Sequence, residues 1–306
     1  MYDIIGDLHG HAELLKKLLL QWGYQKTPDG YAHPTNKAVF VGDFINRGPQ
    51  IRKTVRMIRK MVEKGNALAI AGNHEINAVI FHLKEKNGGT LIKPPRKNDL
   101  ALFKTLDDFI ENQEEWFSHL KWFRTLPLFL ELEGFRVVHA CWAAPAIEYI
   151  RNELPPGKIK KSVFRQILKN PKSELSQNIT TITKGIDFKM PGDLKIINNK
   201  GISPPTFRLR WWENPEGKTF EEMSFESKFL LPSYSIPKEI IPQSFIYPED
   251  EPILFFGHYC RFHGPHIVKS NLCCLDSCIG GSKILTGYRW QGEKKLNEKH
   301  LVQVSY

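Results

Sequence analysis

Residues 38–49 read AVFVGDFINRGP, and this stretch decides the fold. Its first four residues are apolar and favour a buried strand, and the glycine after them allows the chain to turn sharply. The turn carries an acid, Asp43, which is suited to bind a metal ion, and a base, Arg47, which is suited to bind an anion. A Gly-Pro pair then ends the loop. The stretch therefore predicts a strand followed by a loop that carries a metal-binding and an anion-binding residue.

The same alternation extends through the first 140 residues. Strand-like runs cover residues 2–5, 38–41, 67–71 and 135–138, and amphipathic helical patterns cover residues 12–22 and 51–62. A charged helical stretch at about residues 98–123 separates the third and fourth runs. This rhythm is typical of βαβ units, so we expect an α/β fold with parallel strands and right-handed connections.

The composition changes between about residues 151 and 252. Residues 151–200 hold eleven Lys or Arg residues and four Asp or Glu residues, and prolines and polar residues follow with little periodicity. We expect one domain over residues 1–306, with residues 151–252 forming a basic, Pro-rich insertion or cap that is partly loop-like. Its charge favours a solvated surface over a binding groove. Further strands are expected at residues 253–256, 267–275 and 284–290.

The overall composition narrows the class of protein. The chain has 306 residues, of which 41% are hydrophobic and 25% are charged, as in ordinary globular domains. A formal charge of +10 slightly favours a phosphorylated or polyanionic partner, but charge alone is weak support for nucleic acid, which we do not expect to be a partner. Neither a leader pattern nor a run near the roughly 20 apolar residues of a membrane span is present. We therefore expect a cytoplasmic location without membrane association.

The five cysteines do not indicate a disulfide framework or a zinc cluster. They lie at positions 141, 260, 273, 274 and 278, and no two of them have the CxxC spacing of a zinc site. We expect reduced, partly buried thiols. Cys141, Cys260 and Cys278 follow presumed site residues closely, so oxidation near the site is an alternative to inert packing.

Five apolar runs lead into residue types that bind metals. These residues are Asp7, His9, Asp43, Asn73, His139 and His258. Because ligands of open α/β sheets bind beyond the carboxyl ends of the strands, we expect them to converge. A mixed oxygen and nitrogen set without thiolates suits Mn²⁺, Fe or Zn²⁺. Six ligands are too many for one ion that also keeps positions open for substrate, so we expect two ions that share one carboxylate.

The motifs can now be compared with a known family. GDLHG at 6–10, GDFINRG at 42–48 and GNHE at 72–75, followed by VHA at 138–140 and GH at 257–258, resemble the motifs of the calcineurin-like metallophosphoesterase superfamily. Within it they resemble the phosphoprotein-phosphatase branch of bacterial and phage type, which also includes diadenosine tetraphosphatases. The resemblance implies a four-layer α/β/β/α β-sandwich flanked by helices, with the metals at one edge. It spans residues 1–80 and single motifs beyond, and residues 151–252 lie outside it.

The resemblance also implies a role for each residue. The first metal would be held by Asp7, His9 and Asp43, and the second by Asp43, Asn73, His139 and His258. His74 would be the general acid that protonates the leaving oxygen. Arg47 would grip the phosphoryl group, with Asn73 beside the substrate. The implied cofactors are two divalent metal ions, Mn²⁺ in the first place, with Fe or Zn²⁺ as alternatives.

The implied function is a dinuclear metal-dependent phosphatase. It would hydrolyse phosphomonoesters of a protein or nucleotide by direct attack of a metal-bound water or hydroxide, and a protein Ser/Thr phosphatase is one such enzyme. A nucleotide or dinucleoside-polyphosphate hydrolase is the alternative enzyme. A phosphate-sensing protein whose site has decayed at Asn46 is the non-enzyme alternative.

Asn46 departs from the family pattern GDxxDRG, in which the second Asp pairs with the histidine of GNHE. An amide can orient the ring of His74 but cannot stabilise its charge. We hypothesise that His74 has a lowered pKa and that turnover falls on substrates with poor leaving groups. Two alternatives are that another acid such as Glu75 compensates, or that Asn46 was introduced to weaken the enzyme.

Other departures concern positions after residue 139. Ala-Cys-Trp at 140–142 replaces the double glycine of eukaryotic members, which weakens any transfer of their substrate choice. A second phosphate-binding arginine is expected, and Arg151, Arg208, Arg210 and Arg261 are the candidates, each otherwise a surface residue. Asp276 is either close to the site or a turn residue.

Overall fold

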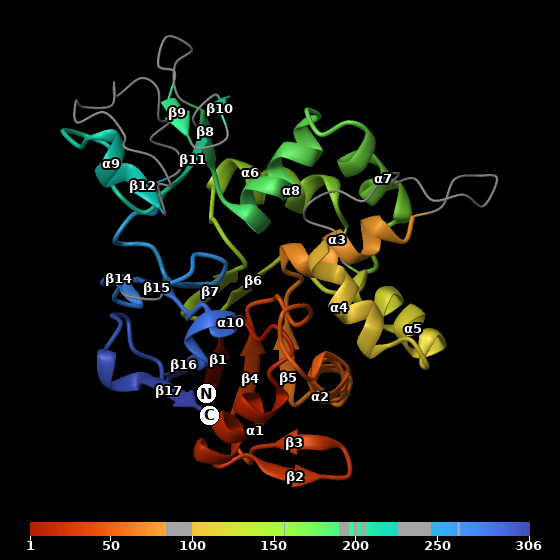
Figure 1. The fold of residues 1–306 in the computed structure, drawn as a ribbon. Coiled ribbons are helices and arrows are strands. Elements are labelled where there is room, and N and C mark those ends of the chain that lie inside the picture. Colours follow the sequence, from red (N-terminus) through yellow and green to blue (C-terminus); the bar gives the residue numbers. More distant parts are fainter. Residues whose placement is uncertain are drawn as a thin grey trace.

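The computed structural model describes residues 1–83, 100–155, 157–189, 196–198, 201–203, 206–225, 246–261 and 264–306. Two five-stranded sheets form its centre, and helices flank them (Figure 1). The α/β class and the sandwich predicted from the sequence are thereby confirmed. Within the described ranges, every helix is too short or too polar to cross a membrane.

The first sheet has the order β17-β16-β1-β4-β5. Its strands are β1 (Tyr2–Ile5), β4 (Lys37–Phe40), β5 (Ala67–Ala69), β16 (Ile284–Trp290) and β17 (Leu301–Ser305). The pairs β1–β4 and β4–β5 are parallel, as the βαβ rhythm predicts, whereas β16 runs antiparallel to β1 and to β17. Helices α1 (Ala12–Gln21) and α2 (Ile51–Glu63) connect the parallel strands and bury their apolar faces.

The second sheet has the order β14-β15-β13-β7-β6. Its strands are β6 (Phe129–Leu132), β7 (Phe135–Val138), β13 (Ile253–Phe256), β14 (Ile267–Lys269) and β15 (Leu272–Cys274). The three central strands are parallel, and an antiparallel strand closes each edge. The run at 135–138 thus belongs to a different sheet from the first three predicted strands.

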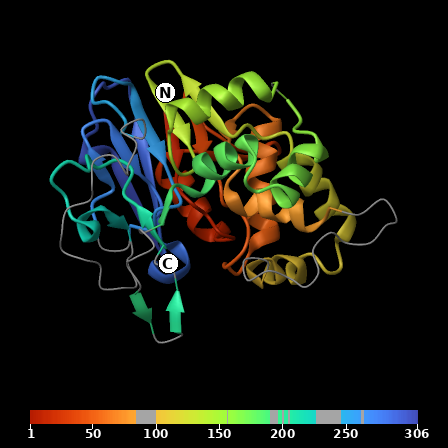
Figure 2. The same ribbon diagram turned by 90° about the horizontal axis from the view of Figure 1, so that it is seen from above.

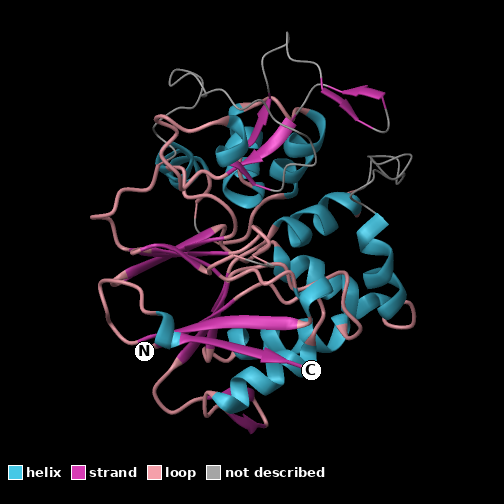
Figure 3. Ribbon diagram, turned by 60° about the vertical axis from the view of Figure 1, so that its left-hand side comes forward, coloured by secondary structure: helices cyan, strands magenta, loops and turns pink. Residues whose placement is uncertain are grey.

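Apolar side chains fill the space between the two sheets. Ile4 and Val39 from one sheet and Phe135 and Phe255 from the other are fully buried in this layer. Figure 3 shows that the loops gather between the strands and the helices. This arrangement brings the loops that follow β1, β4, β5, β7 and β13 to one end of the sandwich.

The charged stretch predicted at about 98–123 is helical, but it is divided into two helices, α4 (Leu100–Asp108) and α5 (Gln113–Phe123). Residues 98–99 lie outside the described residues, and α3 (Asn73–Phe81) precedes the two helices. The break follows from a turn in which the N–H of Asn112 donates to the carbonyl of Phe109.

Other elements also differ from the expectation. The predicted strand at 267–275 is the hairpin β14–β15. Sequence patterns missed β6, β17 and the hairpin of β2 (Gln25–Thr27) and β3 (Gly30–Ala32). The remaining short elements are α10 (Ile279–Ser282) and the 3₁₀-helix η3 (Glu298–His300).

Residues 151–252 contain more regular structure than their periodicity indicates. The helices α6 (Ala144–Glu153), α7 (Lys161–Lys169) and α8 (Glu174–Lys184) lead into β8 (Asp187–Lys189), β9 (Ile196–Asn198), β10 (Gly201–Ser203), β11 (Thr206–Leu209), α9 (Phe220–Met223) and β12 (Ser224–Phe225). A small core of Phe188, Phe207 and Phe220 holds the strands β8 and β11 against α9. Figure 1 shows the described part of this region above the sheets, and Figure 2 looks down on it from that side. Residues 156, 190–195, 199–200, 204–205 and 226–245 of the predicted insertion lie outside the described residues, and the role of the insertion as a cap stays a prediction.

Candidate metal centre and active site

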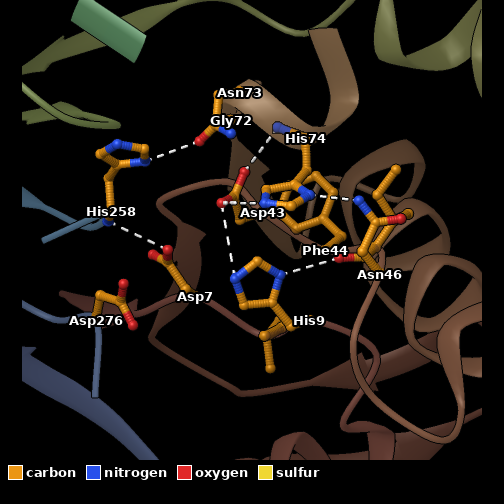
Figure 4. Close-up of polar contacts among 12 residues, drawn as sticks. Asp7, His9, Asp43, Phe44, Asn46, Gly72, Asn73, His74, His258 and Asp276 are labelled. Carbon is orange, nitrogen blue, oxygen red and sulfur yellow. Dashed lines mark hydrogen bonds and ion pairs between the residues drawn. The ribbon is translucent and has the colours of Figure 1, made fainter. Parts of the chain in front are cut away.

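The predicted metal ligands gather around one cavity of about 500 Å³ (Figure 4). Asp7, His9, Asp43, Asn73 and His258 line it. His139 is fully buried, with its Nε2 atom 3.3 Å from Asp43 Oδ1. All six side chains come from loops or helix starts at the ends of strands of the two sheets. The structure therefore brings together every residue that the sequence suggested as a metal ligand.

Asp43 lies at the centre of this group and faces histidines on both sides. Its Oδ2 atom is 3.8 Å from His9 Nε2 and 3.7 Å from His74 Nε2, whereas its Oδ1 atom faces His139. Burial opposes ionisation of Asp43, but the neighbouring imidazoles of His139 and His74 hold the pKa of its carboxyl well below the usual value. Burial would lower the pKa of His139, but Asp43 raises it to about 10. Asp43 is therefore a buried carboxylate that needs positive charge beside it.

Asp7, Asn73 and His258 form the other side of the cavity. The backbone N–H of His258 donates to Asp7 Oδ2 over 3.1 Å, and His258 Nδ1 lies 2.8 Å from Asn73 Oδ1. The buried atoms Asp7 Oδ1 and His258 Nε2 have no hydrogen-bond partner. Burial, and after it the negative charge of Asp276, raises the pKa of Asp7 well above its usual value. Unpartnered buried polar atoms are costly, and a cation bound between these two atoms would satisfy both of them.

The donor set fits divalent cations. Two overlapping groups of ligand atoms share Asp43: one contains His9 and His74, and the other contains His139 and His258. The Nδ1 atoms of His9 and His139 lie 3.0 and 2.7 Å from backbone carbonyls, which leaves each Nε2 facing Asp43. A carbonyl behind the ring is the usual support of a metal-binding histidine. Cations here would neutralise the buried carboxylates and satisfy the unpartnered atoms.

Strained backbone holds these side chains in place. Seven non-glycine residues in the described ranges have a positive φ, and five of them are His9, Asp43, Asn46, Arg47 and His258. Each such conformation costs about 1–3 kcal/mol, and such strain gathers at functional sites. Gly72 and Gly257 contribute in another way, since a Cβ atom on either would collide with the carboxylate of Asp43 or of Asp7.

His74 lies at the first turn of α3, between Asp43 and Asn46. Its backbone N–H donates to Asp43 Oδ1 over 3.0 Å, and its Nδ1 atom contacts Asn46 Nδ2. Burial lowers the pKa of His74, and Asp43 opposes this shift. The carboxylate of Glu75 instead accepts the backbone N–H groups of Asp43, Phe44 and Gly72. These contacts turn Glu75 toward the backbone, which disfavours it as a substitute for the missing aspartate.

Three basic side chains line the same cavity: Arg47, Lys184 and Arg208. Four arginines, all of them among the described residues, were candidates for the second phosphate-binding arginine. Of these, Arg208 is the one that lines the cavity. Its Nε atom is 4.0 Å from Asp187 Oδ1, and its guanidinium lies 5.7 Å from the ring centroid of Tyr259. Arg151 instead pairs with Glu131 and Glu148 away from the cavity. Sequence reasoning missed Lys184, because no motif marks it.

The structure shows where Asp276 lies and which cysteines are paired, two questions that the sequence left open. Asp276 is buried, lines the cavity and lies beside Asp7, so it is close to the site (Figure 4). The expectation of reduced thiols is wrong for Cys260 and Cys278, which form a disulfide. The parallel strands β13 and β15 are neighbours and end side by side. The two cysteines, which are 18 residues apart in the sequence, therefore meet beyond these strand ends. The other three cysteines are free and buried, as expected.

Comparison with known proteins supplies the family. The sequence profile of the calcineurin-like phosphoesterases matches residues 2–262, which is most of the chain and includes all six presumed ligands. The chain belongs to the calcineurin-like phosphoesterase family. The resemblance that the motifs indicated is confirmed.

Relatives within this family carry the names of dinucleoside tetraphosphatases. The asymmetrical bis(5'-nucleosyl)-tetraphosphatase PrpE of Oceanobacillus iheyensis is 32% identical over 45% of this chain and 54% of its own length. The chain thus spans about half the length of that relative. The symmetrical bis(5'-nucleosyl)-tetraphosphatase of a Marinomonas strain is 26% identical over 96% of this chain and 95% of its own length.

A solved structure of similar fold supports the architecture. The cold-active protein-tyrosine phosphatase of a psychrophilic Shewanella is 14% identical, with a TM-score of 0.50 over 94% of this chain and 74% of that one. At this identity the likeness concerns the fold alone.

Proposed function

We propose that this protein is a metal-dependent hydrolase that cleaves phosphate anhydrides of dinucleoside polyphosphates. The observation that carries the proposal is the position of Asp43, whose two carboxylate oxygens face two separate groups of histidines in one cavity. Family membership supports the reaction class. The names of the relatives support the substrate class.

The residues divide into cation ligands and residues that act on the substrate. One divalent cation would be held by Asp7, His9 and Asp43 and a second by Asp43, Asn73, His139 and His258, and the two would supply an activated water and positive charge toward the phosphate. We assign Mn²⁺ first, with Fe or Zn²⁺ as alternatives.

The remaining polar residues of the cavity bind the phosphate and handle the proton. Arg47 presents an exposed guanidinium, which suits two phosphate oxygens. Arg208 and Lys184 extend the positive charge along the same cavity, which fits a chain of phosphates better than a single one. His74 holds the proton for the leaving oxygen, and its ring faces both Asp43 and Asn46.

Asn46 favours an anhydride substrate over a Ser or Thr phosphoester. An alkoxide leaving group is strongly basic and needs a proton from a good acid, whereas the phosphate leaving group of an anhydride has a second pKa of about 6 and needs little help. Without a carboxylate beside it, His74 is a weaker partner for an alkoxide. A phosphoprotein substrate is the second candidate, because the motifs resemble the phosphoprotein-phosphatase branch.

The proposal is tested by hydrolysis assays on several substrates. We expect turnover of p-nitrophenyl phosphate with Mn²⁺ and none after chelation. Product analysis on diadenosine tetraphosphate, a Ser/Thr phosphopeptide and a cyclic nucleotide would then rank the substrates, with the tetraphosphate highest. Absence of metal-dependent turnover on all of them would favour the phosphate-sensing protein instead.

Asn46→Asp is predicted to change activity according to the leaving group. The added carboxylate would stabilise the charged form of His74, so kcat on an alkyl phosphate or phosphoserine peptide should rise about tenfold or more. Activity on the tetraphosphate and on p-nitrophenyl phosphate should change little. Equal activity of the two proteins on the phosphoserine peptide would contradict the role assigned to Asn46, and Asn77→Asp, in the same cavity, is the matched control.

A further inference from the structure

Two arginines lie just outside the cavity, next to the part of its wall that Arg208 forms. Arg210 follows Arg208 on the continuation of β11, where its backbone N–H donates to the carbonyl of Met223 over 2.8 Å. Arg261 directly follows Cys260, which lines the cavity as Arg208 does. We call Arg210 and Arg261 the distal arginine pair.

Strand geometry places the side chains of Arg208 and Arg210 on one face of β11. Side chains alternate between the two faces of a strand. Phe207 and Leu209 are buried in the small core that also contains Phe220. The two arginines therefore project from the opposite face, and Arg210 continues along the chain from the residue that lines the cavity.

Two aromatic rings connect Arg261 to the same face of β11. The guanidinium of Arg208 lies 5.7 Å from the ring centroid of Tyr259, and that of Arg261 lies 6.0 Å from the ring centroid of Phe225. The two ring centroids are 5.0 Å apart. Phe225 is also the register partner of Arg208 in the strand pair β11–β12. Arg261 is therefore two rings away from Arg208, and both guanidiniums contact aromatic surface.

The two guanidiniums of the distal arginine pair act on each other electrostatically. Burial lowers the pKa of Arg261, and the positive charge of Arg210 lowers it further. Glu213 has the opposite effect on this pKa, but its carboxylate forms an ion pair with Lys218. Two neighbouring cations repel each other, and an anion bound beside both of them removes the repulsion. The distal arginine pair therefore favours a bound anion.

Among the residues that the structure describes, no carboxylate forms an ion pair with Arg210 or Arg261. Arg151, by comparison, pairs with two glutamates. The Nε atoms of Arg208 and Arg210 are buried, and within the described ranges they have no hydrogen-bond partner. Unpartnered buried donors are costly, and phosphate oxygens would satisfy them.

The position of Arg261 is fixed from several sides. Its backbone N–H donates to the carbonyl of Asp276 over 2.7 Å, and the residue before it forms the disulfide with Cys278. Its Nε atom donates to the carbonyl of Pro265 over 3.0 Å. A Cβ atom on Gly264 would lie 2.3 Å from Arg261 Nη2, so the glycine leaves room for the guanidinium. A guanidinium that is already held in place loses less entropy when it binds an anion.

We propose that the distal arginine pair binds the phosphates of the substrate that follow the one held by the cations, with Arg208 between the two sites. The pair thereby selects a chain of phosphates over a single phosphoryl group. The guanidinium fork matches phosphate oxygens, and three such groups that begin at the cavity fit several phosphates in sequence. The inference rests on the proposed function and deepens it, because it names where the rest of the polyphosphate chain lies.

Binding of ligands that cannot be hydrolysed tests the inference without any turnover. The probes are inorganic phosphate and a triphosphate whose bridging oxygens are replaced by methylene groups, titrated by calorimetry into Mn²⁺-loaded protein at one fixed concentration of free Mn²⁺. We expect the wild type to bind the triphosphate at least tenfold more tightly than phosphate. Arg210→Gln and Arg261→Gln should each lower the affinity for the triphosphate about tenfold, and the affinity for phosphate much less.

Two further variants control for charge and geometry. Arg151→Gln removes the same charge from an arginine whose ion pairs lie away from the cavity, and it should keep the preference for the triphosphate. Arg261→Lys keeps the charge without the planar fork, and it should recover part of the affinity that Arg261→Gln loses. Circular dichroism and melting temperature confirm that the variants are folded.

A methylene-bridged analogue of diadenosine tetraphosphate distinguishes the phosphate chain from the nucleosides. We expect Arg210→Gln and Arg261→Gln to lower its affinity by the same factor as that of the triphosphate. A loss seen with this analogue alone would mean that the pair contacts a nucleoside, and it would overturn the inference. In the activity assay, the ratio of kcat/KM on diadenosine tetraphosphate to kcat/KM on p-nitrophenyl phosphate should fall about tenfold in both variants.

The outcomes separate this inference from the proposed function. A wild type that binds phosphate and the triphosphate equally well would overturn the inference, even if the variants do not fold. Folded Arg210→Gln and Arg261→Gln proteins that bind the triphosphate as Arg151→Gln does would also overturn it, and turnover of the tetraphosphate would still support the proposed function. If the pair decides the affinity for the triphosphate but no substrate is turned over, the proposed function alone is contradicted.

Discussion

Asp43→Asn is expected to lower kcat/KM on every substrate by roughly a thousandfold or more, and to lower the metal content of the protein. The substitution keeps the shape of the side chain and removes its charge. Asp43 is the residue whose Oδ1 faces His139 and whose Oδ2 faces His9 and His74, so both presumed cation sites lose a ligand at once. Metal content by mass spectrometry and kcat/KM on p-nitrophenyl phosphate measure the two effects.

The matched control is Asp187→Asn. Asp187 lines the same cavity, but its side chain is 70% exposed and its recorded ion pair is with Arg208. Because it does not belong to either group of ligand atoms, it should keep both metals. If a folded Asp43→Asn protein binds two metal ions and keeps the wild-type kcat/KM, Asp43 is not a metal ligand.

The residues at the strand ends could be predicted because each signal is local. In GDLHG, GDFINRGP and GNHE, an apolar strand, a glycine and a polar side chain stand within a few residues. Strand polarity then predicts that Asp7, Asp43 and Asn73 meet at one edge of a sheet. The structure has these three residues around one cavity. The expected parallel order also holds for β1, β4 and β5.

The partners of these residues could not be predicted, because they come from distant segments without a pattern of their own. The hydroxyl of Thr105 accepts the backbone N–H of Asn46, although the two residues are 59 positions apart in the sequence. Thr105 lies on α4, whose apolar spacing indicates only burial. Lys184 and Arg208 reach the cavity from a region whose charge looked like a solvated surface. The disulfide between Cys260 and Cys278 requires β13 and β15 to be neighbours, and no local sequence pattern predicts that pairing.

His74→Asn is expected to lower kcat on alkyl phosphates by a factor of about 10²–10⁴, the usual contribution of a general acid. The loss on diadenosine tetraphosphate and on p-nitrophenyl phosphate should be much smaller, because their leaving groups are weak bases. Kinetics on the three substrates, with metal content measured on the same sample, test this.

The metal content decides between two roles that geometry alone leaves open to His74. Its Nε2 atom belongs to the group of ligand atoms around His9 and Asp43, and because its Nδ1 atom contacts Asn46, Nε2 is the ring nitrogen that faces the cavity. A general acid can be lost without loss of metal, whereas a ligand cannot. Full metal content with a leaving-group-dependent loss of kcat would establish the acid role, and equal losses on all substrates together with missing metal would make His74 a ligand. His82→Asn, at the other end of α3 where the ring lies against Trp116, is the control that should change neither quantity.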